Sequence, residues 1–233
     1  MNNFNILDWD SAFFKFKVAS VIPQTLKIVE IEEMTTQMKA EDVHLAYWKT
    51  PIHIDQFPSK TDVHLADVAC LYSIGLPSER NIHPQISLYS GAMVSQELEN
   101  IAIQCGVFSR FNLDKNFPSN SFEKLYRTWI QKSVSKEIAD DILVYYEKNT
   151  LAGIVTVSSK NSVGNIGLFG IEESMRGKGI GKALLNATIS YFSNKKCTRA
   201  QVITQAKNEA ACGLYEKCGF AVIEKKYCYH FWL

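Results

Sequence analysis

The chain has 233 residues, of which 46% are hydrophobic and 21% are charged, and this composition is typical of a globular protein with a sizeable core. Its 25 basic and 24 acidic residues give a formal net charge of +1, so the basic excess expected of a nucleic-acid-binding protein is missing. No apolar run approaches the roughly 20 residues of a membrane-spanning helix, and the first residues lack the pattern of a signal peptide. We therefore expect a cytoplasmic protein that neither binds nucleic acid nor spans a membrane.

The six cysteines and five histidines are scattered along the chain. They form no CxxC pair, no HExxH motif and no other spacing typical of metal ligands. Without an export signal, the expected state of the cysteines is reduced and mostly buried. The sequence therefore predicts neither a disulfide framework nor a bound metal.

The first part of the chain alternates between short predicted strands and a helix. Runs rich in β-branched or aromatic residues predict strands at residues 18–22, 43–48 and 67–74, and helical spacing of apolar residues predicts a helix over 24–39. Residues 81–89 and 97–103 fit neither pattern clearly, so we place a domain boundary there. We expect a smaller α/β domain over residues 1–100, on the acceptor side of the site, and a second domain over 101–233.

The second domain is predicted to have the order β-β-β-α-β-α-β-β after an initial amphipathic helix. That helix covers residues 121–133, with Ser121 as its cap. Two β-rich runs separated by a short polar gap predict a hairpin. The predicted strands are residues 142–146, 152–157, 166–171, 201–204, 220–223 and 227–233, with helices after residue 179 and at 209–217.

A glycine-rich turn lies between the strand at 166–171 and the helix after it. Residues 176–182 read Arg-Gly-Lys-Gly-Ile-Gly-Lys, which differs from both the Walker A motif and the GxGxxG dinucleotide fingerprint. Alternating glycines at a helix start let backbone amides approach an anion closely, and the helix dipole favours negative charge there. The turn therefore predicts a phosphate site, with a purely structural strand-to-helix turn as the alternative.

The helix at 209–217 carries a second set of candidate residues. Tyr215 is a phenol that is protonated at neutral pH and able to give its proton to a leaving group. Asn208 stands at the head of the same helix. The alternatives are that Tyr215 is a packing residue and that Asn208 is only an N-cap.

Read together, these motifs resemble the GCN5-related N-acetyltransferases. Arg176, Gly179 and Gly181 match the Q/R-x-x-G-x-G/A signature of that family. The run from Asn208 through Ala211 and residues 214–217 to Gly219 and Phe220 matches its second motif. The resemblance covers roughly residues 105–233 and agrees with the predicted order of elements. It implies a mixed, splayed central sheet in an α/β (α+β) fold, and acetyl-CoA as cosubstrate without a metal.

The resemblance also implies roles for individual residues. Backbone amides of residues 177–182 would hold the CoA pyrophosphate, and the strand edge at 169–171 would pair with the pantetheine arm. Asn208 would contact that arm, and Tyr215 would protonate the CoA thiolate as it leaves. The residues assigned in this way to acetyl-CoA are Phe169, Gly170, Ile171, Arg176, Gly177, Lys178, Gly179, Ile180, Gly181, Lys182, Asn208 and Tyr215.

Three shorter patches, at residues 7–14, 109–114 and 229–233, look like the TDP-fucosamine acetyltransferase group. That resemblance implies N-acetylation of a dTDP-linked 4-amino-4,6-dideoxyhexose for surface polysaccharide synthesis. It points to Phe14, Arg110 and His230 as substrate-side residues. The sequence specifies neither the amino sugar nor the nucleotide, and it leaves a homodimer open.

One departure from the family concerns the general base. The strand before the turn offers no carboxylate, and Glu172 and Glu173 just beyond it are interpreted as solvated charges. Water, His230, or loss of the amine proton before binding remain as alternatives. An acetyltransferase for protein or peptide amines, and an acyl-CoA-binding module without turnover, are the other functions that the sequence leaves open.

Overall fold

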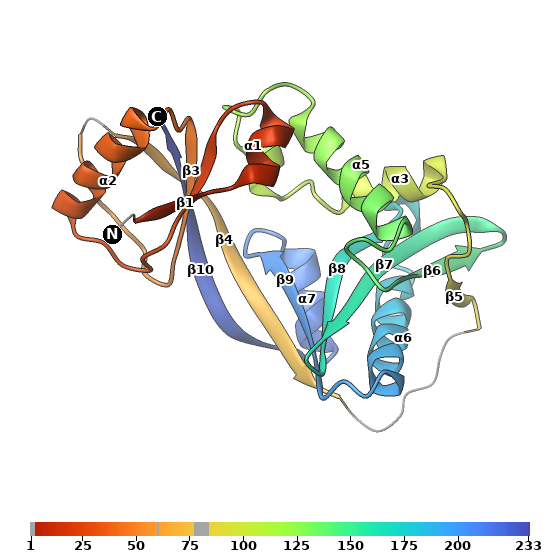
Figure 1. Cartoon of the computed structure of the whole chain (residues 1–233). Coiled ribbons are helices and arrows are strands. Elements are labelled where there is room, and N and C mark those ends of the chain that lie inside the picture. Colours follow the sequence, from red (N-terminus) through yellow and green to blue (C-terminus); the bar gives the residue numbers. More distant parts are fainter. Residues whose placement is uncertain (1–2, 60, 77–83) are drawn as a thin grey trace. The chain divides into compact units, whose positions relative to one another are not determined.

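The computed structural model describes residues 3–59, 61–76 and 84–233, and the chain forms two compact units (Figure 1). The first unit comprises Met1–Cys70 and Glu224–Leu233, and the second comprises Leu71–Ile223. Two long strands, β4 (Asp62–Gly75) and β10 (Ala221–Trp232), carry the chain from one unit into the other. No described helix has both the length and the apolar composition needed to cross a membrane.

The first unit is a small mixed sheet with a helix packed against it. Its elements before β4 are β1 (Phe4–Ile6), α1 (Asp8–Phe14), β2 (Val18–Val21), α2 (Ile28–Ala40) and β3 (Leu45–Thr50). Strand β2 pairs with β1 antiparallel and with β3 in parallel, and the end of β10 pairs antiparallel with β3. The apolar stripe of α2 meets the strands in a core of Phe4, Ala19, Val21, Ile31, Met34, Met38, Val43, Ala46, Trp48, Tyr229 and Phe231.

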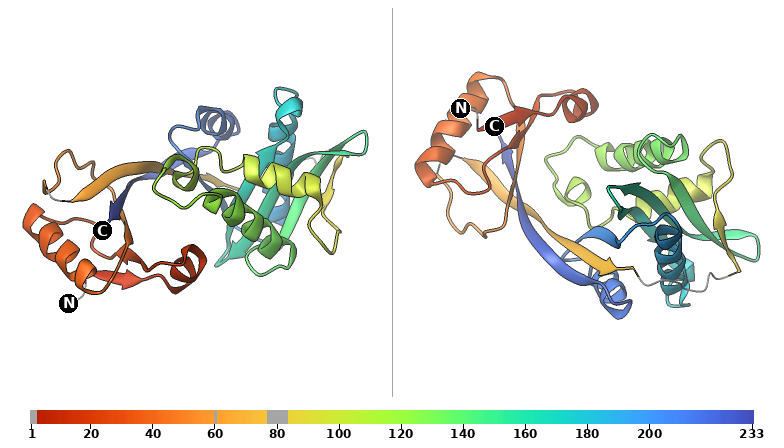
Figure 2. Two further views of the ribbon diagram at one scale, coloured as in Figure 1. Left: turned by 90° about the horizontal axis from the view of Figure 1, so that it is seen from above. Right: turned by 60° about the horizontal axis from the view of Figure 1, so that its bottom comes forward.

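The second unit has a larger sheet with helices on both faces. In chain order its elements are β5 (Ile86–Leu88), α3 (Gln96–Gln104), α4 (Arg110–Leu113), α5 (Ser121–Val134), β6 (Asp141–Glu147), β7 (Thr150–Lys160), β8 (Val163–Ile171), the 3₁₀ turn η1 (Glu173–Met175), α6 (Ile180–Asn194), β9 (Arg199–Gln205) and α7 (Glu209–Lys217). Strands lie in the order β9-β8-β7-β6-β5, antiparallel except for the parallel β8–β9 pair. Helices α3 and α5 lie on one face, and α6 lies on the other (Figure 2).

The predicted hairpin is the β6–β7 pair. Lys148 and Asn149 at its tip have φ of 47° and 68°. Positive φ at both central residues is the geometry of a two-residue turn that matches the twist of the flanking strands. The hairpin places β7 in the middle of the sheet, where it pairs with β8.

Strand β8 is irregular where it approaches the predicted site. Its register with β7 shifts between Val155 and Val157, and the Thr156 hydroxyl accepts a hydrogen bond from the Leu168 amide at 2.7 Å. Parallel pairing with β9 runs from Val163–Arg199 to Ile166–Val202, whereas β8 continues to Ile171. The last residues of β8 therefore extend past the part of the strand that pairs with β9. Their backbone edge on the side of β9 is not covered by that strand.

The structure differs from the sequence predictions at several boundaries. Residues 71–100 lie in the second unit, because β5 pairs with β6 and α3 packs on β7 and β8, whereas residues 224–233 complete the first unit. The two predicted closing strands are one strand, β10, because the charged residues at 224–226 contain no Gly or Pro to interrupt it. Asn120, not Ser121, occupies the cap position of α5. Residues 81–83 of the unassigned stretch 81–89 lie outside the described residues.

Candidate active site

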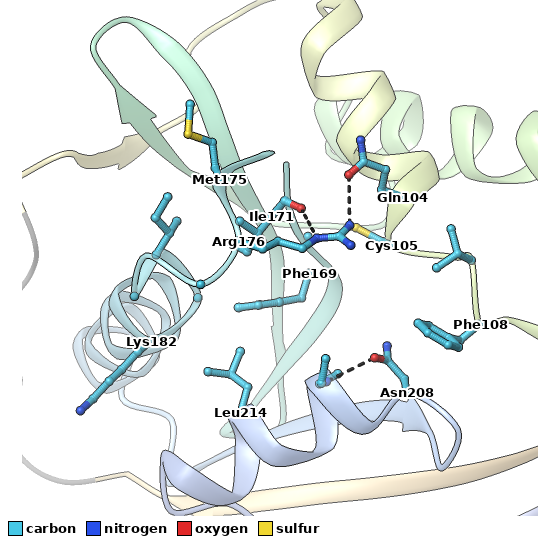
Figure 3. A pocket seen from close by; sticks show the side chains of 18 residues that line it. Gln104, Cys105, Phe108, Phe169, Ile171, Met175, Arg176, Lys182, Asn208 and Leu214 are labelled. Carbon is cyan, nitrogen blue, oxygen red and sulfur yellow. Dashed lines mark hydrogen bonds between the residues drawn. The ribbon is translucent and has the colours of Figure 1, made fainter. Parts of the chain in front are cut away.

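A cavity of about 380 Å³ opens in the second unit where β8, α6, α7 and the end of α3 converge (Figure 3). Its size lies within the range of small-molecule sites. The lining residues are Gln104, Cys105, Val107, Phe108, Phe169, Gly170, Ile171, Met175, Arg176, Gly177, Gly179, Ile180, Gly181, Lys182, Asn208, Ala210, Ala211 and Leu214. Both motifs predicted from the sequence therefore meet at one hollow.

The glycine turn forms one side of the cavity. Gly177 and Gly179 have φ of +76° and +81°, and no atom lies within 4 Å of the Cβ that either would carry as another residue. Gly179 is the N-cap of α6, a helix of 15 residues. The amides of its first turn have no partner inside the helix, so they are available to an anion. The local backbone therefore requires glycine, and it leaves room beside those amides.

Helices α6 and α7 approach closely beside the turn. A Cβ at Gly181 would lie 3.1 Å from a methyl carbon of Leu214. The third glycine of the motif therefore serves close packing, whereas the first two serve backbone conformation. Leu214 in turn places an apolar wall inside the cavity.

The charge at the cavity is positive. Among the described residues that line it, Arg176 and Lys182 are cations, and none is an Asp or Glu. The Arg176 side chain donates from Nε to the Ile171 carbonyl and from one terminal nitrogen to Gln104 Oε1, both at 3.2 Å. Arg176 thereby links the glycine turn to the end of β8 and to α3 (Figure 3).

Asn208 caps a helix and also lines the cavity. Its Oδ1 accepts a hydrogen bond from the Ala211 amide at 3.2 Å, which caps α7. Its side chain also lines the cavity (Figure 3). Because the cap uses the carbonyl oxygen, the amide nitrogen is available to donate to a ligand.

Tyr215 lies behind the cavity wall and is only 2% exposed. Its ring packs against Tyr72, Phe169 and Phe220, with centroids 5.6, 6.0 and 5.8 Å away. Burial, with smaller effects from Cys105 and Cys212, raises the pKa of its phenol well above the usual value of 10.0. The group is therefore a protonated phenol at neutral pH, and its ring packs directly behind Phe169, which lines the cavity.

The end of α3 forms the side of the cavity that sequence reasoning missed. Gln104, Cys105, Val107 and Phe108 line it, and none of them belongs to a motif. The available signal was the buried stripe of Leu98, Ile101 and Ala102, which indicates a helix and carries no chemistry. Gln104 also donates to the Glu172 carboxylate at 3.1 Å, so that carboxylate is engaged beside the end of β8.

Of the residues assigned to acetyl-CoA, all line the cavity except Lys178 and Tyr215. Lys178 is exposed, and its Nζ lies 3.3 Å from the Met175 sulfur. The substrate-side residues fall in different units. Phe14 and His230 are buried in the first unit, where the His230 ring lies 5.1 Å from that of Tyr47. Arg110 begins α4 in the second unit and stacks over the Phe111 ring at 4.6 Å.

Residues 107–220 match the family described as Acetyltransferase (GNAT) family. Mycothiol acetyltransferase of Corynebacterium efficiens is 28% identical over 44% of this chain and 32% of its own length. N-alpha-acetyltransferase 30 of Saccharomyces cerevisiae is 33% identical over 29% of this chain and 38% of its own. The chain thus spans about a third of the curated relatives that it matches.

Among solved structures, a putative acetyltransferase from the GNAT family of Novosphingobium aromaticivorans superposes with a TM-score of 0.56 at 13% identity. The match covers 99% of this chain and 88% of the other. At this identity the likeness concerns the fold alone. The mixed α/β architecture predicted from the sequence is therefore confirmed as the fold of GNAT proteins.

Proposed function

We propose that this chain is an N-acetyltransferase that uses acetyl-CoA as donor, because residues 107–220 match the acetyltransferase (GNAT) family. The observation that carries the proposal is the cavity that joins the start of α6 to the end of β8, where β8 continues past its pairing with β9. The acetyltransferase names of the curated relatives support the same reaction class.

The residues present fit the donor. At Gly177 and Gly179 a Cβ would enter the open space beside the helix amides, and glycine keeps that space for an anion. The cations Arg176 and Lys182 suit a pyrophosphate at the same place. Phe108, Ile171 and Leu214 give the remaining wall an apolar character suited to the pantetheine arm.

Acetyl-CoA would supply the thioester carbonyl that the acceptor amine attacks. The backbone at Phe169–Ile171 would hold the arm by main-chain hydrogen bonds, and an amide of this edge would stabilise the developing oxyanion. Asn208 would donate its amide hydrogen to the arm. Tyr215, kept protonated by burial, would give its proton to the departing thiolate. Holding amine and thioester together in one cavity would itself contribute much of the rate.

The acceptor that we propose is the amine of a nucleotide-linked 4-amino-4,6-dideoxyhexose. The support is the resemblance of residues 7–14, 109–114 and 229–233, which include Phe14, Arg110 and His230. His230 is fully buried against Tyr47, so a packing role accounts for it without chemistry. We therefore propose that the amine reaches the site unprotonated or loses its proton to water.

The test is a panel of amines assayed for release of CoA thiol from acetyl-CoA. The panel contains dTDP-linked amino sugars, the matching UDP-linked sugars, free amino sugars and peptides with free N-termini. Acetylation of a nucleotide-linked sugar, at a kcat/KM at least tenfold above every other class, is the expected result. Turnover restricted to peptides would instead favour the second candidate, to which the yeast N-alpha-acetyltransferase relative points.

A binding module without catalysis gives a distinct outcome. Calorimetry would then show CoA binding, whereas no amine in the panel would release thiol from acetyl-CoA. The presence of both Asn208 and the buried Tyr215 beside the cavity argues for turnover.

A further inference from the structure

Cys105, at the end of α3, is pressed against the backbone of β8. A Cβ on Gly170 would lie 2.5 Å from the Cys105 sulfur and 2.9 Å from Ile101 Cγ2. The thiol donates to the Ile101 carbonyl at 3.2 Å, which fixes its direction. Cys105 and Ile101 therefore lie in contact with the strand edge that is proposed to hold the donor, and neither can move away easily.

The thiol also lies near the atoms at which the proposed reaction would occur. The sulfur packs against Gly170, and the ring of the neighbouring residue Phe169 lies 6.0 Å from the Tyr215 ring. If β8 amides polarise the thioester carbonyl and Tyr215 protonates the leaving sulfur, the acyl group must lie between these groups. Cys105 lines the cavity beside Phe169 and Gly170 of this strand.

We propose that the side chain at position 105, held against Gly170 and Ile101, sets the length of the acyl group that the cavity accepts. This inference rests on the proposed acetyl-CoA-dependent activity. A two-carbon acyl group would fit in front of the sulfur, whereas the further methylenes of a butyryl group would meet the sulfur, which Gly170 and Ile101 back. Cys105 is thus a specificity-determining residue and not a nucleophile.

The chemistry of the thiol agrees with a steric role. Burial raises the pKa of Cys105 to about 12, and the smaller opposing effects of the Phe169 amide and Arg176 do not reverse this. A thiol of that pKa is neutral at physiological pH, and only the thiolate is a good nucleophile. The residue therefore shapes the pocket without competing for the acyl group.

The experiment measures Kd for CoA, acetyl-CoA and butyryl-CoA by calorimetry, without any acceptor, for the full chain and its variants. The wild-type protein should bind acetyl-CoA at least roughly tenfold more tightly than butyryl-CoA, since a misfitting methylene costs that factor or more. Cys105→Ala, which removes only the sulfur, should lower this ratio by roughly tenfold. Cys105→Leu should raise the Kd of acetyl-CoA more than the Kd of CoA itself, because the larger side chain fills the space of the acetyl group.

Two control variants separate the effect of side-chain size at position 105 from a general effect of removing a thiol from this unit. Cys105→Ser keeps the size of the side chain and should keep the wild-type ratio. Cys212→Ala removes another thiol of the same unit, one that donates to the Gln205 carbonyl at 3.6 Å and does not line the cavity. It too should keep the ratio.

The outcomes are distinguishable. An unchanged butyryl-to-acetyl ratio in folded Cys105→Ala that binds CoA normally would overturn the inference alone. So would an equal change in Cys212→Ala. Failure of the wild-type protein to bind CoA at all would overturn the proposed function and the inference with it.

Discussion

The glycine side of the cavity, Gly177 and Gly179 before α6, is built from backbone, whereas the thiol side, Cys105 and its neighbours at the end of α3, is built from side chains. On the glycine side, positive φ and the absence of Cβ atoms create the space. On the thiol side, a sulfur packed against Gly170 limits it. A backbone anion site needs the same few residues in the same order, while a side-chain wall can be built in many ways. We expect the glycine side to determine donor binding and the thiol side to determine which acyl group the cavity accepts.

The largest effect is expected from Tyr215→Phe. Removing the proposed acid should lower kcat by roughly 10² to 10⁴, the usual contribution of general acid catalysis, with little change in the Kd of acetyl-CoA. Steady-state kinetics and calorimetry on the same preparation measure the two quantities. Unchanged turnover would remove Tyr215 from the chemistry and leave it as a packing residue.

Tyr72→Phe is the matched control, because its ring lies 5.6 Å from that of Tyr215 and its hydroxyl donates to Glu216 instead. This variant should keep a near wild-type kcat. The pH profile offers a second check. Since burial raises the pKa of Tyr215, the protonated acid persists as pH rises, and kcat should not fall between pH 8 and about 10. A descending limb near pH 9 would contradict the assignment.

The next largest effect concerns the reactivity of Cys105. With its pKa raised from 9.0 to about 12 by burial, its thiolate fraction at pH 8 should be lower by roughly 10³, each pKa unit being a factor of ten. Iodoacetamide labelling, read by peptide mass spectrometry, should therefore be far slower at Cys105 in the folded protein than in urea. Equal rates would mean that the folded protein does not suppress ionisation of this thiol.

The raised pKa of Cys105 also predicts how the free energy of unfolding depends on pH. The unfolded chain ionises this thiol near pH 9, whereas the folded chain does so only near 12. The contribution of the neutral Cys105 thiol to the free energy of unfolding is therefore fully present below pH 9. That free energy decreases as the pH rises from 9 toward 12. Cys105→Ala should weaken that decrease.

The contrast between the two sides also explains what could be predicted from the sequence. Gly177, Gly179 and Asn208 were identified because conformation and capping restrict those positions to few residue types. The role of Cys105 depends on its packing against Gly170, 65 positions along the chain by their numbers, and no local pattern encodes that contact. Only the helix that carries it has a periodic signal, and residues 97–103 were too short a stretch to assign.

Larger elements show the same limit. The strands of the second unit were predicted from their β-rich runs, and the β6–β7 hairpin from its polar gap. The continuity of β10 could not be predicted, because whether a charged segment forms a strand depends on the strands that pair with it. Residues Tyr227–Trp232 of β10 pair with β3. The boundary between the two units could not be predicted either, since it depends on the pairing of β10 with β3, which are far apart in the sequence.

A smaller effect should follow from Gly179→Ala. A Cβ at φ +81° costs about 1–2 kcal/mol and enters the space beside the helix amides, so the Kd of CoA should rise about tenfold. Gly213→Ala is the matched control, because nothing lies within 4 Å of its Cβ position and its φ is not positive. That variant should leave the Kd unchanged and raise Tm, since alanine is the better helix former. Equal effects of both substitutions on CoA binding would show that the glycine side is not the anion site.

The smallest effect is expected at Arg176, whose side chain is exposed and joins the two sides of the cavity through Ile171 and Gln104. Exposed charge interactions are worth about 0.2–1 kcal/mol, so Arg176→Gln should raise the Kd of CoA by a factor of roughly 1.4 to 5. Arg176→Lys separates charge from geometry, because lysine keeps the charge but lacks the planar fork that spans both acceptors. If the charge matters, lysine restores the affinity and the difference shrinks in high salt. If the bridge to α3 matters, lysine behaves like glutamine and the difference is insensitive to salt. An Arg176→Gln variant with wild-type affinity at low salt would show that the glycine amides suffice and that Arg176 serves only to tie β8 to α3.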